Sequence, residues 1–494
     1  MTSKISLSLV SHTNVGKTSL ARTLLGRDVG EVRDAPHVTD QADEHELLRS
    51  PAGDVLALWD TPGFGDSARL AQRLRHSGNP IGWFLSEVWD RWRDRPFWAS
   101  QQALRNVRER ADVVLYLVNA AEDPAAAGYV APEMELLAWL GKPVLVLLNQ
   151  LGAPRAAADD EADLRRWREH LARHPQVRQV LPMDAFARCW VQEGVLWGAV
   201  ANVLDEARRP AMARLQAAWA EARLESFAAS MAALAGSLGR IATARVPFDD
   251  GGFRQTLRQW GESLGLPNRA PDPHEQAHQT LVRLIDDELR AATDALISLH
   301  GLQGQAREQA LALVATRFEL RRKVDEGRAA LLGGVVSGAL TGLKADIASG
   351  GLTLGGGLLA GSVLGALGAA GAARGLNLAR GTERNWVGCS AEVLALVMHT
   401  ALLRYLAVAH FGRGRGVWVD GEAPPHWVAA VHQATGEQQA ALAAAWLGRG
   451  AGADNADDAE RLADALQPLL AGSARAALEQ LYPGTWPSQE PQTP

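Results

Sequence analysis

Residues Ser11 to Thr18, which read SHTNVGKT, have the types and spacing that grip nucleotide phosphates. Successive backbone N–H groups in such a loop form a concavity for anions, and a following helix adds the positive end of its dipole. Gly16 lets the backbone approach the phosphates, Lys17 reaches the β- and γ-phosphates, and the Thr18 hydroxyl can bind Mg²⁺. We predict a phosphate-binding loop that contains Ser11 (where a glycine is usual), His12, Thr13, Asn14, Val15, Gly16, Lys17, Thr18 and Ser19.

A second motif, LWDTPGF, places Asp60 and Gly63 after an apolar run. Asp60 would hold Mg²⁺, directly or through water, and the Gly63 N–H would meet the γ-phosphate. Loss of that phosphate releases such a loop, which is how a nucleotide switch works. A DTPG turn can also follow a strand without this role, but the distance from Lys17 favours the switch.

Strands and helices must position these two motifs. Short runs rich in β-branched and leucine residues alternate with amphipathic stretches: runs at 5–10, 55–59, 113–118 and 144–148, and stretches at 19–25 and 132–140. This alternation predicts an α/β fold for residues 1–205, with a mainly parallel sheet and helices on both faces, as in P-loop NTPases.

The second half of the chain has a different pattern. Beyond Pro210 the strand signal disappears, and long Ala-, Leu-, Arg- and Glu-rich segments are separated by expected loops, the first of them at 246–252. We therefore expect a mostly α-helical region. The expected divisions are a helical domain at 206–328, a glycine-rich apolar hairpin at 329–376, a helical domain at 377–481 and a disordered tail at 482–494.

The first 205 residues resemble the Era- and TrmE-like branch of the translation-factor-related GTPases. Four elements carry the resemblance: NVGKTSL at 14–20, WDTPGFGD at 59–66, ADVVLYLVNA at 111–120 and GKPVLVLLNQ at 141–150. The resemblance implies that the chain binds GTP and GDP, requires Mg²⁺ and hydrolyses GTP. Thr39 lies where the family's switch I threonine closes over Mg²⁺ and the γ-phosphate; the alternative is an ordinary loop threonine.

The resemblance also bears on how hydrolysis is stimulated. Phe64 occupies the position of the glutamine that orients water in Ras-like enzymes, and an apolar side chain cannot do so. Potassium-activated members of the branch hold K⁺ with an asparagine at the place of Asn14, in a site that closes when two GTPase domains meet. The candidate catalytic residues are therefore Lys17, Thr39, Gly63 and Asn14, with a homodimer through the GTPase domains. Alternatively, Asn14 only supports the loop.

The base-recognition motif departs from the family. The expected Asn-Lys-x-Asp is Asn149, Gln150, Leu151 and Gly152, so the carboxylate that pairs with guanine is missing. Asn149 can still contact the base edge, and the Gln150 stem can lie against the ring. Further along, Ala185 would offer its N–H to the guanine O6, and Asp184 is a candidate to replace the lost carboxylate. Use of ATP instead of GTP therefore stays open.

A Trp-rich insert at 80–100 follows the DTPG motif. It interleaves four tryptophans with three arginines: Trp83, Trp89, Trp92 and Trp98 with Arg91, Arg93 and Arg95. Such interleaving occurs at nucleic-acid and membrane interfaces. Aromatic residues this dense also pack against another domain, which we favour here. The insert's place after the switch motif makes it a candidate lever that transmits the nucleotide state.

Residues 329–373 are apolar and rich in glycine. Two uncharged stretches, 329–343 and 347–373, contain glycines at every fourth position, Gly334, Gly338 and Gly342 in the first and Gly357, Gly361 and Gly365 in the second. That spacing allows close helix contact in membranes, and the second stretch is long enough to span. We expect a membrane-contacting hairpin with Lys344 and Asp346 at its tip. The alternative is a tightly packed soluble hairpin.

Composition and motif context argue against several classes of protein: nucleic-acid-binding, disulfide-rich, secreted and zinc-dependent. A net charge of −6 and a pI near 6.1 give no general attraction to nucleic acid, and two distant cysteines argue against a disulfide framework. The first apolar run is short for a secretory signal, so we expect a cytoplasmic protein, peripheral or integral at the inner membrane. The string HEQAH at 274–278 matches a zinc-protease pattern but follows Pro273 at an expected helix start, so we expect no zinc.

Two functional classes remain. The first is a membrane-associated GTPase switch whose nucleotide state exposes or withdraws the glycine-rich hairpin. The second is a soluble GTPase in RNA or ribosome assembly. We favour the second class less, because the net charge is negative and no RNA-binding pattern is recognisable after residue 210.

Overall fold

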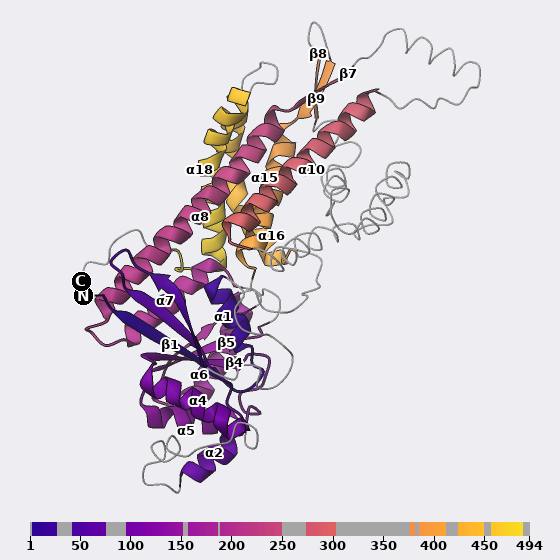
Figure 1. Ribbon diagram of the computed structural model, residues 1–494. Coiled ribbons are helices and arrows are strands. Elements are labelled where there is room, and N and C mark those ends of the chain that lie inside the picture. Colours follow the sequence, from indigo (N-terminus) through magenta and orange to yellow (C-terminus); the bar gives the residue numbers. More distant parts are fainter. Residues whose placement is uncertain are drawn as a thin grey trace, which may run out of the picture. The chain divides into compact units, whose positions relative to one another are not determined.

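The computed structural model describes residues 2–26, 42–75, 95–151, 157–185, 188–248, 273–302, 376–380, 385–411, 423–448 and 456–487. The chain divides into two compact units (Figure 1). Unit 1 contains residues 1–225 together with 409–418 and 481–494. Unit 2 contains residues 226–408 and 419–480.

Unit 1 is built on a six-stranded sheet in the order β2-β3-β1-β4-β5-β6. The strands are β1 (Lys4–Ser11), β2 (Asp43–Arg49), β3 (Val55–Asp60), β4 (Val113–Asn119), β5 (Val144–Asn149) and β6 (Val177–Pro182). Only β2 pairs antiparallel with its neighbour. The four predicted strands are confirmed as β1, β3, β4 and β5. Sequence analysis missed β2 and β6 because edge strands carry polar residues that break a continuous apolar run.

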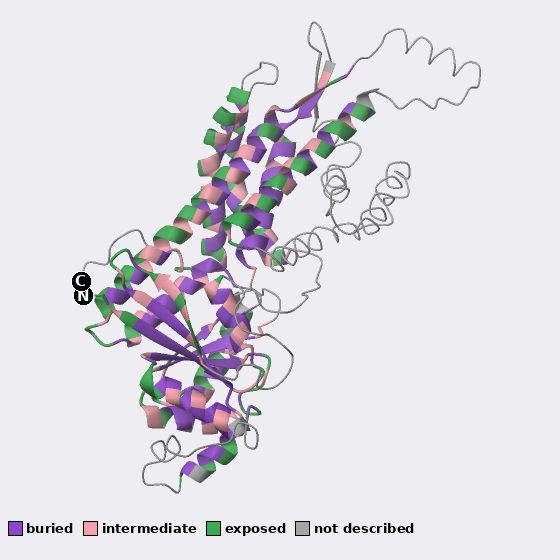
Figure 2. Ribbon diagram, in the orientation of Figure 1, coloured by how far each residue is buried: buried purple, intermediate pink, exposed green. Residues whose placement is uncertain are grey.

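Helices cover both faces of this sheet (Figure 1). One face carries α1 (Lys17–Leu25) and α7 (Trp190–Val203), and the other carries α2 (Ser67–Leu74), α4 (Arg95–Glu109), α5 (Val130–Leu140) and α6 (Ala157–Leu171). Figure 2 shows the central strands as buried, and Phe64, Tyr116 and Trp167 are each fully buried in the core of the second face. The predicted α/β P-loop fold is confirmed. It places the loops after β1, β3 and β5 at the carboxyl edge of the sheet, where α/β proteins bind ligands.

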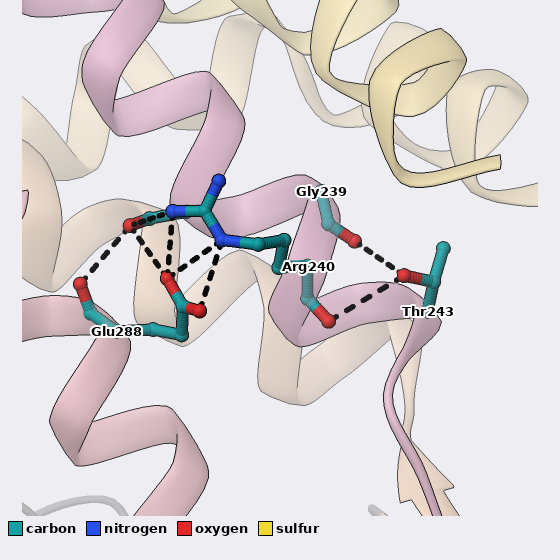
Figure 3. Close-up of polar contacts among 5 residues, drawn as sticks. Gly239, Arg240, Thr243 and Glu288 are labelled. Carbon is teal, nitrogen blue, oxygen red and sulfur yellow. Dashed lines mark hydrogen bonds and ion pairs between the residues drawn. The ribbon is translucent and has the colours of Figure 1, made fainter. Parts of the chain in front are cut away.

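Helices dominate the C-terminal region, as predicted. Those in the described part of the chain are α8 (Arg209–Thr243), within which the division between the units falls, α10 (Pro273–Leu299), α15 (Ala391–Ala409), α16 (Pro425–Glu437), α17 (Gln439–Leu447) and α18 (Ala456–Leu481). Glu288 of α10 accepts hydrogen bonds from Arg240 of α8, Nε at 2.9 Å and Nη2 at 2.8 Å (Figure 3). A Cβ on Gly239 would lie 2.3 Å from the Ala459 carbonyl oxygen, so only glycine allows α8 to approach α18 this closely.

The expectation that strands end near Pro210 is wrong. Unit 2 contains an antiparallel sheet in the order β7-β9-β8, formed by β7 (Arg245–Phe248), β8 (Leu376–Arg380) and β9 (Asn385–Cys389). The expected loop at 246–252 thus begins with the strand β7. Strands this short have little periodicity of their own, and β7 pairs with a segment far away in the sequence.

One described helix, α15, is long and apolar enough to cross a membrane by length and composition, with a hydropathy of 1.5, but 78% of that stretch is buried within the protein. The core helix of a soluble protein has the same character, so this is weak evidence for a span. Thr39, residues 80–94 of the Trp-rich insert, residues 329–375 of the expected hairpin and residues 488–494 lie outside the described residues. The HEQAH string falls at the start of α10, as expected from Pro273.

Candidate functional site

The loop that connects β1 to α1 has the backbone of a phosphate-binding loop. Asn14 and Gly16 both lie in the left-handed region, with φ of 65° and 93°. A Cβ on Gly16 would lie 2.7 Å from Asn149 Nδ2, so glycine is required there for conformation and for space. Asn14 is exposed, and α1 begins directly at Lys17. The N-terminal N–H groups of α1 therefore follow the loop without interruption.

Lys17 is buried beside the loop. Its Nζ donates a hydrogen bond to Ser11 Oγ at 3.0 Å, and the residue is only 8% exposed. Burial lowers the pKa of Lys17, while Asp60 and Glu133 act in the opposite direction. Ser11, which replaces the usual leading glycine, thus provides an acceptor for this ammonium group. Anionic phosphates would add to the opposite charge of Asp60 and Glu133 around this buried cation.

Thr18 and Asp60 lie together beneath the loop. Thr18 Oγ1 donates to Asp60 Oδ2 at 2.7 Å. Asp60 Oδ1 is buried and has no hydrogen-bond partner among the described residues, and burial raises the pKa of Asp60 above its ordinary value. A buried acceptor without a donor is costly, and hydroxyl and carboxylate oxygens are the ligands that Mg²⁺ prefers. The pair therefore fits a Mg²⁺ ion.

The DTPG segment lies along the phosphate loop. Phe64 N–H donates to the Ser11 carbonyl at 2.9 Å, and Thr61 Oγ1 donates to the Leu9 carbonyl at 2.7 Å. A Cβ on Gly63 would lie 3.0 Å from Lys17 Nζ, so Gly63 is beside the lysine. The Phe64 side chain is fully buried in the core. It cannot orient a water molecule at the phosphates, which agrees with the argument from its apolar character.

Asn149 joins the phosphate loop to the base side. Its Nδ2 donates to the Val15 carbonyl at 2.7 Å, and its Oδ1 accepts the Ala185 N–H at 2.8 Å. The Ala185 N–H, predicted for guanine O6, is thus bonded to Asn149 in this structure, and its contact with a base stays a prediction. Gln150 follows with φ of 59° in a left-handed conformation and is half-buried.

Asp184 holds the loop after β5 in place. Its Oδ2 accepts the Leu151 N–H at 2.6 Å, and the residue is 4% exposed. Gly152, where the family carries its base-reading aspartate, lies outside the described residues. Asp184 therefore braces the backbone next to the degenerate motif, and its action as a substitute for the lost carboxylate stays a prediction.

A buried glutamate under the phosphate loop was missed by the sequence analysis. Glu133 Oε1 lies 2.7 Å from His12 Nδ1, and Glu133 Oε2 accepts the Tyr116 hydroxyl at 2.6 Å. Burial raises the pKa of Glu133, and hydrogen bonds from His12, Tyr116 and Ser67 act against this. His12 also stacks on Tyr129 with ring centroids 4.5 Å apart. No signal in the sequence links Glu133 to His12, because the pairing depends on α5 packing against the sheet.

Comparison with known families covers most of the chain. Residues 6–150 match the family described as "50S ribosome-binding GTPase". Residues 168–467 match the family described as "Domain of unknown function (DUF3482)". The predicted resemblance of the N-terminal domain to Era-like P-loop GTPases is confirmed. The region that follows this domain in the chain is uncharacterised.

Solved structures similar to this chain include two of Era. Era in complex with MgGDPNP and nucleotides 1506–1542 of 16S ribosomal RNA has 19% identity over 42% of this chain, with a TM-score of 0.31. A variant of Aquifex aeolicus Era bound to GDP and AlF4⁻ has 20% identity over 41%, with a TM-score of 0.30. A bacterial selenocysteine-specific elongation factor has 14% identity over 41% of this chain and 29% of its own, with a TM-score of 0.27. The match spans 58% of each Era chain.

Proposed function

The chain belongs to the DUF3482 family, and an Era-like P-loop GTPase domain precedes the part of the chain that matches this family. We propose that the chain hydrolyses GTP as a conformational switch. The observation that carries the proposal is the meeting of two pairs of residues at the end of β1. Lys17 Nζ lies beside Gly63, and the Thr18 and Asp60 oxygens lie together beneath the same loop. Such a site senses the γ-phosphate through the DTPG segment.

In this mechanism the chain's own residues bind and orient the nucleotide. The loop N–H groups and Lys17 would neutralise the β- and γ-phosphates, and the Gly63 N–H would meet the γ-phosphate. Thr18 and Asp60, with Thr39 as predicted from the resemblance, would hold Mg²⁺. When bound, that ion neutralises the charge that develops on the phosphate oxygens. Release of the γ-phosphate would free the DTPG segment from the loop.

The hydrolysis step needs a stimulating group that Phe64 cannot provide. We propose K⁺, held in part by the Asn14 side chain, as a charge that offsets the leaving phosphate. Asn14 is exposed at the rim of the loop, where a second GTPase domain can reach it. Turnover would then rise with both K⁺ and protein concentration, because a homodimer completes the site.

For base selection we propose a preference for GTP over ATP by a smaller margin than in relatives with the full motif. Asn149 and the Ala185 N–H would contact the base, but Gly152 has no carboxylate for the guanine N1–H and N2 amino group. The first experiment is therefore binding and hydrolysis of GTP and ATP by the full chain, in K⁺ and in Na⁺. Tighter binding of ATP than of GTP would refute the GTPase proposal.

For location we propose a cytoplasmic protein that contacts the inner membrane through residues 329–373. The support is the sequence: two uncharged stretches with glycine at every fourth residue. Cosedimentation of the full chain with phospholipid vesicles tests this. Leu364→Arg places a charge within the longer stretch and should reduce binding, because a charge at the centre of a membrane helix costs about 2.5–3.5 kcal/mol. Leu447→Arg, at an 81% exposed site on α17, is the matched control.

The family description of the N-terminal domain favours a second candidate, a soluble GTPase that acts on RNA or in ribosome assembly. Cosedimentation with ribosomal particles, run beside the vesicle assay, separates the two. Nucleotide-dependent binding to particles, with no binding to vesicles, would replace the membrane proposal.

A further inference from the structure

Two segments of the C-terminal region belong to the same compact unit as the phosphate site. They are residues 409–418, which follow α15, and 481–494, which follow α18. His410 of the first segment bonds to the chain between β6 and α7, whose described residues, 183–185 and 188–189, we call the β6–α7 loop. The second segment contacts His410 through Tyr482 and the start of α7 through Trp486. The β6–α7 loop carries Ala185 and Asp184, the groups on the base side of the nucleotide site.

Arg188 connects the β6–α7 loop to two other segments. Its backbone N–H donates to the His410 carbonyl at 3.1 Å, and its Nη2 donates to the Thr23 carbonyl at 3.2 Å. Thr23 in turn donates from Oγ1 to the Ala185 carbonyl at 2.8 Å. Arg188 is 7% exposed, so these bonds form away from water. The end of α1, the loop and the residue after α15 thus form one bonded group.

The contact with His410 follows from helix geometry. The last carbonyls of a helix have no partner inside it, and the residue directly after α15 offers its carbonyl to Arg188. The His410 ring is fixed from the other side, since its Nε2 lies 2.8 Å from the Tyr482 hydroxyl. Burial raises the pKa of Tyr482 well above its ordinary value, so this hydroxyl keeps its proton.

A second contact involves tryptophans. Trp486 packs edge-on against Trp190, the first residue of α7, with ring centroids 5.4 Å apart. Trp190 also lies 6.3 Å from Trp219. The start of α7 is therefore enclosed by aromatic side chains, one of which comes from the last described residues of the chain.

A buried ion pair fixes the other side of Arg188. Glu193 pairs with Arg188 and with Arg223, the latter at 3.1 Å, and accepts the Trp219 indole N–H at 2.9 Å. Burial opposes its ionisation, yet the two arginines hold the pKa of Glu193 below its ordinary value. A buried ion pair with further hydrogen bonds is rigid, so a movement of Arg188 should also move the residues that are bonded to it.

We propose that His410, Tyr482 and Trp486 of the C-terminal region are positioning residues for the base side of the nucleotide site, and that they set how long a nucleotide stays bound. The proposal rests on the nucleotide-binding function argued above. A change in the C-terminal region would reach the site through Arg188 and Ala185. The effect on phosphate binding should be smaller, because Lys17 makes its contacts with Ser11 and Gly63, and only Asn149 links Ala185 to the loop, through the Val15 carbonyl.

The test uses the full chain with Tyr482→Phe and Trp486→Ala. Two probes are compared: a fluorescent GDP derivative, whose release rate is measured, and Mg²⁺-tripolyphosphate, which has no base. Loss of one hydrogen bond or ring contact should speed GDP release by about two- to tenfold. Tripolyphosphate affinity should stay within about twofold of the wild-type value. Trp386→Ala, at a half-buried tryptophan of unit 2, is the matched control and should leave both unchanged.

Unchanged GDP release in both variants would overturn the proposal. So would an equal loss of GDP and tripolyphosphate binding, since that outcome indicates general destabilisation. Tyr482→Phe keeps the ring and removes only the hydroxyl, so it remains informative if Trp486→Ala fails to fold. A wild-type chain that binds tripolyphosphate but no GDP would instead refute the proposed function.

Discussion

The phosphate-binding residues of the proposed site come from two short motifs near the start of the chain, whereas the proposed base side contacts residues from the end of the chain. Ser11, Lys17 and Gly63 lie within the first segments of the fold and follow the family pattern with one substitution. On the base side the motif is degenerate at Gly152, and Arg188 is held by His410. The difference teaches that the phosphate-binding motifs, which resemble known relatives, make their described contacts within the first 150 residues of the chain. The base side, where the motif departs from them, contacts His410 of the uncharacterised region.

The largest effect is expected from Lys17→Ala, which tests the phosphate side alone. This lysine is the cation placed beside Gly63, and charge-assisted hydrogen bonds to phosphate are the strong ones. Affinity for GTP and for Mg²⁺-tripolyphosphate should fall on the order of 100-fold, measured by equilibrium titration. Near wild-type affinity for a GTP analogue would remove the phosphate-loop assignment.

Asn149→Ala tests whether the phosphate side and the base side are separate, because Asn149 bonds to both of them. Removal of its amide leaves the Val15 carbonyl and the Ala185 N–H without their partner. Each buried group left unpaired costs about 1–3 kcal/mol. We expect lower unfolding free energy in urea and weaker binding of both GDP and tripolyphosphate. If only GDP binding is lost, the two sides are more independent than the bonds of Asn149 indicate.

Asn14→Ala tests how GTP hydrolysis is stimulated on the phosphate side. The substitution should abolish stimulation of GTP hydrolysis by K⁺ relative to Na⁺, while GTP affinity changes by less than about twofold because Lys17 and the loop amides remain. Turnover is measured over a range of protein concentrations in both salts. Equal wild-type rates in Na⁺ and K⁺ at every concentration would refute the mechanism and point to a group supplied by a partner.

The smallest effects concern pH, where the two sides should respond in opposite directions. Burial raises the pKa of Glu133 above its ordinary 4.5, so the native state binds this proton more tightly than the unfolded state. Its contribution to stability therefore declines as pH rises above about 4.5. The pKa of Glu193 is lowered instead, so its contribution is present above about 4.5 and is lost as pH falls.

Urea unfolding of Glu133→Gln and Glu193→Gln across this pH range measures both slopes. Relative to the wild type, Glu133→Gln should gain stability as pH rises, and Glu193→Gln should lose less as pH falls. Slopes of the same sign in the two variants would contradict the assignment of opposite environments.

The sequence alone determined the motifs and the strands that are buried on both faces. Phosphate binding relies on contiguous residues, so SHTNVGKT and DTPG are recognisable without a fold. The runs at 5–10, 55–59, 113–118 and 144–148 are central parallel strands, and burial on both faces keeps them apolar apart from Ser6 and Ser8. The edge strands β2 and β6 and the small sheet of unit 2 lack that constraint, and for this reason they were not predicted.

Only the tertiary structure decided which distant residues support the site. The Glu133 carboxylate meets the His12 ring, and the Arg188 guanidinium meets the Thr23 carbonyl, because helices and sheet bring these residues together. A lone buried carboxylate or guanidinium has no periodic signature, since its partner can lie at any separation in the chain. Local patterns encode the groups that touch phosphate, whereas the buried charges that hold those groups are encoded by packing.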